Sequence, residues 1–279
     1  MNGNSRKSLL CPRCRKLISG DEAICPYCGL AKPASRKLLK LANFFSTGRV
    51  DMVDLILYLN AGFYVLSLLL APSSLSLSMN PFNLLSPSNE SLFRLGASGV
   101  IPIGGYDRWW TLISASFLHG SLLHIIFNMI ALRQLGPFVQ REYGASRFLL
   151  IYILTGIAGF LLSFLAGVAF TIGASAGICG LIGAIIYYGK SRGDFYGHLI
   201  YRQAMGWVAG LVIIGIIVPA INNWAHGGGI ISGIALAWLL GYQENAGRRL
   251  GYLIATWACV FTTGAVLLWS VVQAVFIYI

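Results

Sequence analysis

Apolar runs of about 20 residues recur along this chain, and they constrain its fold more than any other feature. A helix needs a run of that length to cross the hydrocarbon core of a bilayer. Hydrophobic residues make up 57% of the 279 residues and charged residues only 10%, whereas soluble domains carry about 25% charged residues. The sequence therefore predicts an all-α polytopic membrane protein and disfavours a soluble globule.

Seven segments are long and apolar enough to be membrane helices: 53–71, 111–136, 147–170, 175–190, 204–221, 225–243 and 251–277. The stretch 72–110 is rich in Ser, Pro, Gly and Asn and is too polar to span. A loop this long in a compact bundle is usually functional or disordered. Turns at 171–175 and 219–223 are expected to fold the flanking apolar stretches into hairpins, which brings Ser175 and His226 to the same membrane face.

The distribution of Lys and Arg indicates the orientation, because cytoplasmic loops are enriched in these residues. Of the 20, 18 lie in the N-terminal tail or in connections on its side of the membrane. The tail is therefore expected in the cytoplasm, and the C-terminus outside. The net charge of +11 is mainly this topology signal. Attraction to anionic lipid is secondary, and no nucleic acid is expected as a partner. No cleavable signal peptide is visible, which fits a bacterial or archaeal plasma membrane.

Ionisable side chains at membrane depth are costly and mark functional sites. All nine Asp and Glu residues lie in the tail, in loops or at segment edges. This disfavours a Ser-His-Asp triad and a carboxylate-lined ion pathway, but a Ser-His pair can still activate a hydroxyl. Ser175 follows Gly173 at the start of a predicted helix, where N–H groups can stabilise an oxyanion. A Ser among glycines is also a common cap or packing residue, and that alternative stays open.

His226 is followed by Gly229 and Gly233 at i+3 and i+7, so the three residues share one helix face. The segment that begins at Ser175 has a matching face of small residues. Packing the two faces would place the Ser175 hydroxyl against the His226 imidazole, as nucleophile and base. The alternative is a pair of helices packed through small residues, with an incidental His.

His124 and Asn128 lie at i and i+4 on one face of the second predicted helix. Both side chains can donate hydrogen bonds, so they suit an oxyanion hole. An interhelical polar contact is the alternative. A metal site built from His119, His124 and His226 is disfavoured, because no carboxylate accompanies them.

The tail contains two CxxC pairs with ten residues between them. This spacing predicts a tetrahedral zinc site with four thiolate ligands, and a redox CxxC is the alternative. The module is too small for a hydrophobic core, so the metal would supply its folding energy. Four Cys ligands leave no open coordination position, which favours a structural role or docking of a cytoplasmic protein partner. The predicted ligands are Cys11, Cys14, Cys25 and Cys28.

Several motifs, in order, resemble the rhomboid family of intramembrane serine proteases over residues 51–245. FLHGSLLHIIFNM at 117–129 is similar to the family's second-helix signature, and LGP at 135–137 and REYG at 141–144 resemble the stretch that follows. GAS at 173–175 resembles the nucleophile motif GxSG. AHGGG at 225–229, with Gly233, resembles the sixth-helix motif in which a His precedes GxxxG.

The resemblance implies Ser175 as nucleophile, His226 as general base and acid, and an oxyanion hole of His124, Asn128 and the Ser175 N–H. It implies substrates that are transmembrane proteins, cut within the lipid bilayer near the outer end of a helix that can unwind. It implies no cofactor for catalysis. The chain would then comprise a zinc ribbon (1–30), a basic linker (31–50), a rhomboid-like six-helix membrane domain with a membrane-embedded first loop (51–245), and one extra C-terminal transmembrane helix (246–279).

The chain departs from the family pattern at several positions. Ala176 replaces the Gly after the nucleophile, and Cys179 stands where an aromatic residue often packs on the catalytic His. RWW at 108–110 replaces a Trp-Arg pair, and Gln140 stands where Glu is frequent. None of these changes removes a catalytic group. A catalytically inactive rhomboid-like scaffold that binds membrane helices is the alternative function, and a transporter or channel is disfavoured because intramembrane carboxylates are missing.

Overall fold

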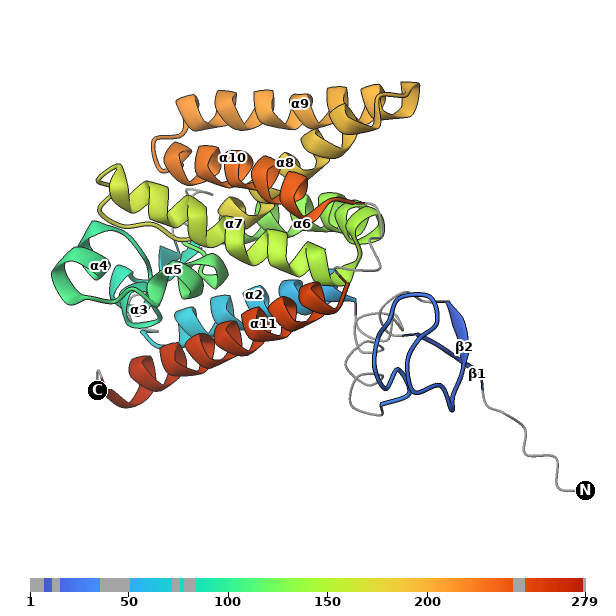
Figure 1. Cartoon of the computed structure of the whole chain (residues 1–279). Helices are drawn as coiled ribbons and strands as arrows, with labels where there is room; N and C mark the ends of the chain where they lie inside the picture. Colours follow the sequence, from blue (N-terminus) through green and yellow to red (C-terminus); the bar gives the residue numbers. More distant parts are fainter. Residues whose placement is uncertain are drawn as a thin grey trace, which may run out of the picture.

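The structure, a computed structural model, describes residues 8–11, 16–35, 51–71, 76–77, 84–242 and 249–277. A small β module precedes a bundle of helices (Figure 1). Seven of the described helices have 18 residues or more, in agreement with the seven predicted segments. They are α2 (Met52–Leu69), α6 (Leu122–Tyr143), α7 (Ala145–Leu165), α8 (Ser175–Arg192), α9 (Phe195–Ile217), α10 (Asn223–Leu240) and α11 (Arg249–Val272), which continues as a π-helical turn, η3 (Gln273–Ile277).

Five of these helices are long and apolar enough to cross a membrane by length and composition: α2, α6, α7, α9 and α11 with η3. The other two, α8 and α10, are rich in Gly. The prediction of an all-α polytopic membrane protein is confirmed.

The two predicted hairpin turns are present. The first separates the end of α7 from the start of α8 at Ser175, and the second separates the end of α9 from the start of α10 at Asn223. Both fall at the positions where the sequence interrupts its apolar runs. Ser175 and His226 therefore lie in the first turns of two long helices.

Two predicted helix starts differ from the structure. The segment 111–136 is not one helix, because α5 (Thr111–Ser114) and η2 (Ala115–Phe117) precede a break. Helix α6 begins only after Ser121, whose hydroxyl accepts a hydrogen bond from the His124 N–H at 3.3 Å. The segment predicted from residue 204 begins at Phe195, because Asp194 caps α9 by accepting from the Gly197 N–H at 2.7 Å.

Helix α8 packs against α6, α7, α9 and α10. Figure 1 shows α9 on one side of this group and α2 and α11 on the other. The contact between α8 and α10 is close at backbone level: a Cβ added to Gly233 would lie 2.2 Å from the Gly180 carbonyl oxygen, and one added to Gly183 would lie 2.3 Å from the Ile230 carbonyl oxygen. Lipid provides no hydrophobic force between helices, so close approach through small residues holds them together. The predicted packing of the two small faces is confirmed.

The polar stretch before α6 contains short elements among its described residues: β3 (Ser76–Leu77), β4 (Leu84–Ser86), α3 (Asn89–Arg94) and α4 (Val100–Tyr106). Arg108 anchors it from within, because its side chain is buried. The guanidinium donates to the carbonyl oxygens of Phe93 at 2.7 Å and Arg94 at 3.1 Å. It also lies over the rings of Phe93 and Trp110, at 4.5 and 4.7 Å from the centroids. The Arg before the two Trp residues thus fixes the loop.

The β module consists of an antiparallel hairpin, β1 (Ser8–Leu10) with β2 (Leu17–Ser19), followed by a second turn closed by a bridge between Ile24 and Ala31. Its backbone hydrogen bonds continue to Ser35, whose N–H donates to the Lys32 carbonyl at 3.0 Å. The predicted boundary at residue 30 stays a prediction.

Candidate active site

Ser175 is the first residue of α8 and is partly exposed. The N-cap residue, Ala174, has no side-chain acceptor, and within the described residues no side-chain cap is found for the first N–H groups of this helix. Gly173 has a φ of +125°, which favours glycine, and its N–H donates to the Ala115 carbonyl at 2.9 Å. The turn therefore presents the Ser175 hydroxyl next to an uncapped helix N-terminus.

The His124 imidazole lies beside the same turn. A Cβ added to Gly173 would lie 2.8 Å from His124 Nε2 and 3.6 Å from Ser175 Oγ, so the absence of that side chain makes room for both groups. The Gly120 N–H donates to His124 Nδ1 at 3.3 Å. When Nδ1 accepts, the proton of the neutral ring is on Nε2. The nitrogen that faces Gly173 is therefore a hydrogen-bond donor.

Asn128 lies one turn further along α6 and is buried. Its Nδ2 donates to the His124 carbonyl at 2.9 Å, which uses one of its two N–H groups. Among the described residues no partner is found for the second N–H, which can donate to a substrate oxygen. The assignment of His124 and Asn128 to an oxyanion hole stays a prediction.

His226 lies in the first turn of α10 and is partly buried. Its Nδ1 is buried and has no hydrogen-bond partner within the described ranges. No hydrogen bond between Ser175 and His226 is found in the described part of the chain. The Ser175–His226 contact therefore stays a prediction.

Helices α8 and α10 pack closely near their N-terminal ends. A Cβ added to Gly229 would lie 2.3 Å from the Ala176 carbonyl oxygen and 3.0 Å from the Cys179 Cβ. Gly229 is one turn after His226, and Ala176 directly follows Ser175. This crossing therefore sets the spacing between the two helix turns that carry the predicted nucleophile and base.

Ala176 and Cys179 have structural explanations. The Ala176 methyl group is buried in a small cluster with Ala115, Phe160 and Ala225. It faces α7, where a Cβ added to Gly159 would lie only 2.9 Å from it. Cys179 is also buried and packs on Gly229. Both side chains occupy helix contacts.

Two residues near the site were not predicted from the sequence as part of it. His119 is fully buried, and its ring packs edge-on against His124 with centroids 5.0 Å apart. Asn222, just before α10, hydrogen-bonds to side chains of two other segments. Asn is common at helix N-caps, so the sequence could have identified Asn222 as a cap. Its distant partners leave no local signal.

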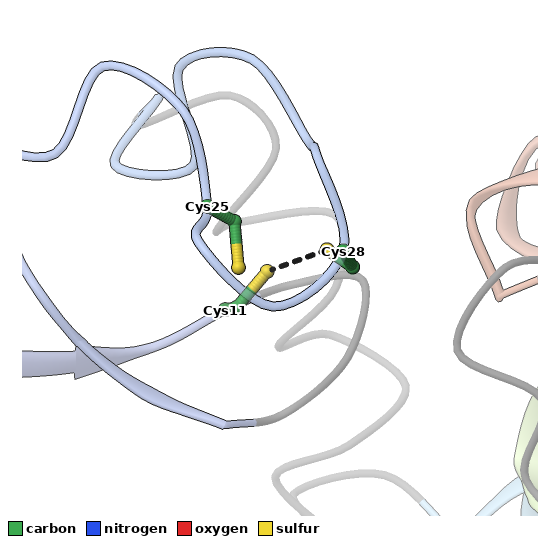
Figure 2. Close-up of side chains that lie close together, drawn as sticks. All are labelled: Cys11, Cys25 and Cys28. Atoms are coloured by element: carbon green, nitrogen blue, oxygen red, sulfur yellow. Dashed lines mark hydrogen bonds between the residues drawn. The ribbon is translucent and has the colours of Figure 1, made fainter.

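The N-terminal Cys residues form a second candidate site. The sulfur atoms of Cys11, Cys25 and Cys28 lie within 4.8 Å of one another and point toward a common centre (Figure 2). Cys11 and Cys28 Sγ are 3.7 Å apart, close to the ~3.8 Å expected between thiolates on a tetrahedral zinc ion. Cys14, the fourth predicted ligand, lies outside the described residues. The donor set fits a metal ion.

Comparison with known proteins places this chain in a family. The rhomboid domain matches residues 106–243. The Bacillus subtilis rhomboid protein YdcA is 30% identical over 159 residues, which cover 53% of this chain and 80% of YdcA. The chain belongs to the rhomboid family. The predicted resemblance is confirmed.

Other rhomboids are similar over the same region. Rhomboid protease GluP of Bacillus subtilis is 34% identical over 169 residues, which cover 59% of this chain and 33% of GluP. RHOMBOID-like protein 4 of Arabidopsis thaliana is 32% identical over 172 residues, covering 59% of this chain and 42% of that protein. The matched part therefore spans about a third of GluP and less than half of RHOMBOID-like protein 4.

Proposed function

We propose that this rhomboid is an intramembrane serine endopeptidase that cleaves transmembrane helices of other proteins. The observation that carries the proposal is that the Ser175 hydroxyl and the His124 Nε2–H donor both lie beside the open space at Gly173 where a Cβ would stand. Acyl transfer requires a nucleophile and preorganised donors around one open position. Similarity to GluP, a rhomboid protease, supports the same reaction class.

In the proposed mechanism, Ser175 Oγ attacks the scissile carbonyl carbon while His226 takes the hydroxyl proton. The oxyanion accepts hydrogen bonds from the Ser175 N–H, His124 Nε2–H and the second N–H of Asn128. The C–N bond then breaks as protonated His226 gives its proton to the leaving amine. Water, deprotonated by His226, hydrolyses the acyl-enzyme, and the proton returns to Ser175 Oγ.

The positions of the acidic residues favour a catalytic dyad over a triad. Each ion pair found within the described ranges joins an Arg to an acid that lies in the first or last turn of a helix or at its N-cap: Asp54 with Arg133, Glu90 with Arg94, Glu142 with Arg141, and Asp194 with Arg192. In the proposed enzyme, helix packing orients the His226 imidazole in place of a carboxylate. Catalytic hydrogen bonds often tighten only when substrate is bound, so the Ser175–His226 bond is expected to form then.

The proposed substrates are transmembrane proteins in the lipid bilayer. Because Ser175 is at a helix end, the cut is expected near one membrane surface, which the charge distribution assigns to the outside. The substrate helix must unwind locally, since a helical peptide bond is shielded by its own backbone hydrogen bonds. The same charge distribution supports a cytoplasmic N-terminus and an external C-terminus in a bacterial or archaeal plasma membrane.

The test is cleavage of a membrane substrate whose helix is weakened by Gly or Pro. Ser175→Ala and His226→Ala should abolish turnover. Removing one oxyanion donor, by His124→Phe or Asn128→Ala, should lower kcat about 100-fold. Ser232→Ala is a matched control on α10, because among the described residues the Ser232 hydroxyl bonds to carbonyls of its own helix alone, those of Gly228 and Gly229. Turnover by Ser175→Ala would overturn the proposal.

A non-catalytic scaffold is the second candidate, and the unpartnered His226 Nδ1 within the described ranges favours testing it. A fluorophosphonate reacts with an activated serine without any need for substrate recognition. The folded protein should be labelled, and Ser175→Ala should not. A folded protein that binds membrane helices but resists labelling would be a scaffold.

For the N-terminal module we propose a structural zinc ion held by Cys11, Cys14, Cys25 and Cys28. A thiolate site with four protein ligands stabilises a fold and leaves no position for catalysis. The cytoplasmic location expected for the tail keeps thiols reduced, which favours metal binding over disulfides. A cytoplasmic protein partner of this ribbon is the proposed reason for its presence.

A further inference from the structure

Asn222 precedes α10 directly and lies four residues before His226. We infer that Asn222 is a positioning residue, which fixes the place of the His226 imidazole relative to Ser175. This inference rests on the proposed protease function and adds to it a residue that touches neither substrate nor reacting atoms.

The Asn222 side chain joins three segments of the chain. Its Nδ2 donates to Ser163 Oγ at 2.5 Å, near the end of α7, and to Thr171 Oγ1 at 2.8 Å, in the turn before α8. Its Oδ1 accepts from the Ala225 N–H at 3.1 Å and so caps α10. We call Asn222, Ser163 and Thr171 the Asn222 clasp.

The clasp uses both N–H groups and one lone pair of the Asn222 amide group, in a single orientation. Ala225 offers an N–H, so the atom facing it must be the oxygen, and both N–H groups then face the hydroxyls. Ser163 and Thr171 are buried, so neither can exchange its partner for bulk water. The clasp therefore holds α10 to the other two segments in a single geometry.

The clasp is within four residues of both reacting groups along the chain. The His226 N–H donates to the Asn222 carbonyl at 3.2 Å, so the base is one helical turn from the clasp. Thr171 is four residues before Ser175, and its backbone is bridged to Ser98 at 2.8 and 3.0 Å. Asn222 is thus a short polar link between the turn that carries the base and the turn that presents the nucleophile.

Two substitutions separate the clasp from the helix cap. Asn222→Ser keeps an acceptor for the Ala225 N–H, because Ser is a good N-cap, but is too short to reach Ser163 and Thr171. Asn222→Asp keeps the cap and the length, and the two hydroxyls can rotate to donate to its carboxylate. Ser232→Ala is the matched control on the same helix.

The experiment measures kcat and KM on the membrane substrate and the rate of fluorophosphonate labelling. Asn222→Ser should lower kcat at least tenfold with KM nearly unchanged, because a misplaced base slows chemistry without removing a substrate contact. Labelling should slow by the same factor. Asn222→Asp should restore most of the activity, and Ser232→Ala should match the wild type. If Asn222→Ser does not fold, Thr171→Val removes one clasp hydroxyl at nearly constant shape and should lower kcat several-fold with KM unchanged.

A wild-type kcat for folded Asn222→Ser would overturn the inference, as would equal losses of kcat in Asn222→Ser and Asn222→Asp.

Hydrogen exchange distinguishes failure of this inference from failure of the proposed function. If the wild type neither cleaves nor is labelled, the protease proposal fails. The clasp is then judged by amide exchange in peptides covering residues 168–178, which Asn222→Ser should accelerate and Asn222→Asp should not. Unchanged exchange in Asn222→Ser would overturn the clasp itself.

Discussion

Replacing Gly229 with Ala should impair turnover far more than replacing Gly227, which is two residues away on the same helix. A Cβ on Gly229 would lie 2.3 Å from the Ala176 carbonyl oxygen, whereas a Cβ on Gly227 would have no atom of another described segment within 4 Å. The obstructing atom belongs to the backbone of α8 and cannot rotate away as a side chain can. Helices α8 and α10 must therefore move apart to accept the new methyl group.

The size of the effect follows from this distance. An ordinary contact begins near 3.4 Å, so the helices must separate by about 1 Å at the Gly229 crossing. Overpacking of this kind typically costs about 1–3 kcal/mol of stability. A displacement of about 1 Å in a catalytic constellation can cost about 100-fold in rate. Because Ser175 and His226 lie within one turn of this crossing, we expect kcat to fall by about that factor.

The assay compares kcat and thermal unfolding of the single variants in one detergent. Gly228→Ala should be intermediate, because its Cβ would meet the Gly159 Cα at 3.0 Å. Gly227→Ala should keep wild-type kcat and be neutral or slightly stabilising, since Ala favours a helix over Gly by up to about 1 kcal/mol. Wild-type turnover in Gly229→Ala, or equal losses in Gly227→Ala and Gly229→Ala, would refute the reasoning.

Three further changes test other parts of the chain. Metal analysis should find zinc in the purified protein, and the zinc should be lost in Cys25→Ser and retained in Cys259→Ser. Cys11→Ser should leave kcat largely intact. A loss of turnover in Cys11→Ser would make the ribbon part of the active enzyme. Arg108→Ala should lower the free energy of unfolding by about 2–4 kcal/mol, because two hydrogen bonds from a buried guanidinium and its ring contacts disappear. Arg94→Ala should cost less than about 0.5 kcal/mol, because Arg94 is partly exposed and its side chain pairs with the exposed Glu90. Similar shifts in thermal unfolding for the two variants would contradict this. Hydrogen bonds from the Arg192 side chain and the Gly197 N–H lower the pKa of Asp194 below its ordinary value of 3.8, so its stabilising effect is complete well above that pH and disappears as the pH falls through the lowered pKa. Asp194→Asn should reduce the acid sensitivity of unfolding in that range, and an unchanged profile would count against the cap.

The sequence was sufficient for the helices and for the arrangement of the two hairpins, because apolar length and Gly or Pro breaks are local signals. It also predicted which faces of α8 and α10 meet, since small residues at i, i+3 and i+7 mark a close crossing. It missed the start of α6, because the small and apolar residues 111–118 join the apolar run of α6 in a hydropathy pattern, and the start of the helix is marked by the Ser121 cap. Hydropathy alone does not detect a cap.

The contacts that position the site residues could not be predicted from the sequence, for a different reason. Asn222 is 59 residues from Ser163 and 51 from Thr171, and no periodic pattern connects positions so far apart. In lipid, one apolar helix face is nearly equivalent to another, so burial does not select a single register. Close glycine contacts and buried hydrogen bonds make that selection. The separation of Ser175 and His226 thus depends on residues such as Gly229 and Asn222 that carry no chemistry themselves, and these are where substitutions should separate folding from turnover.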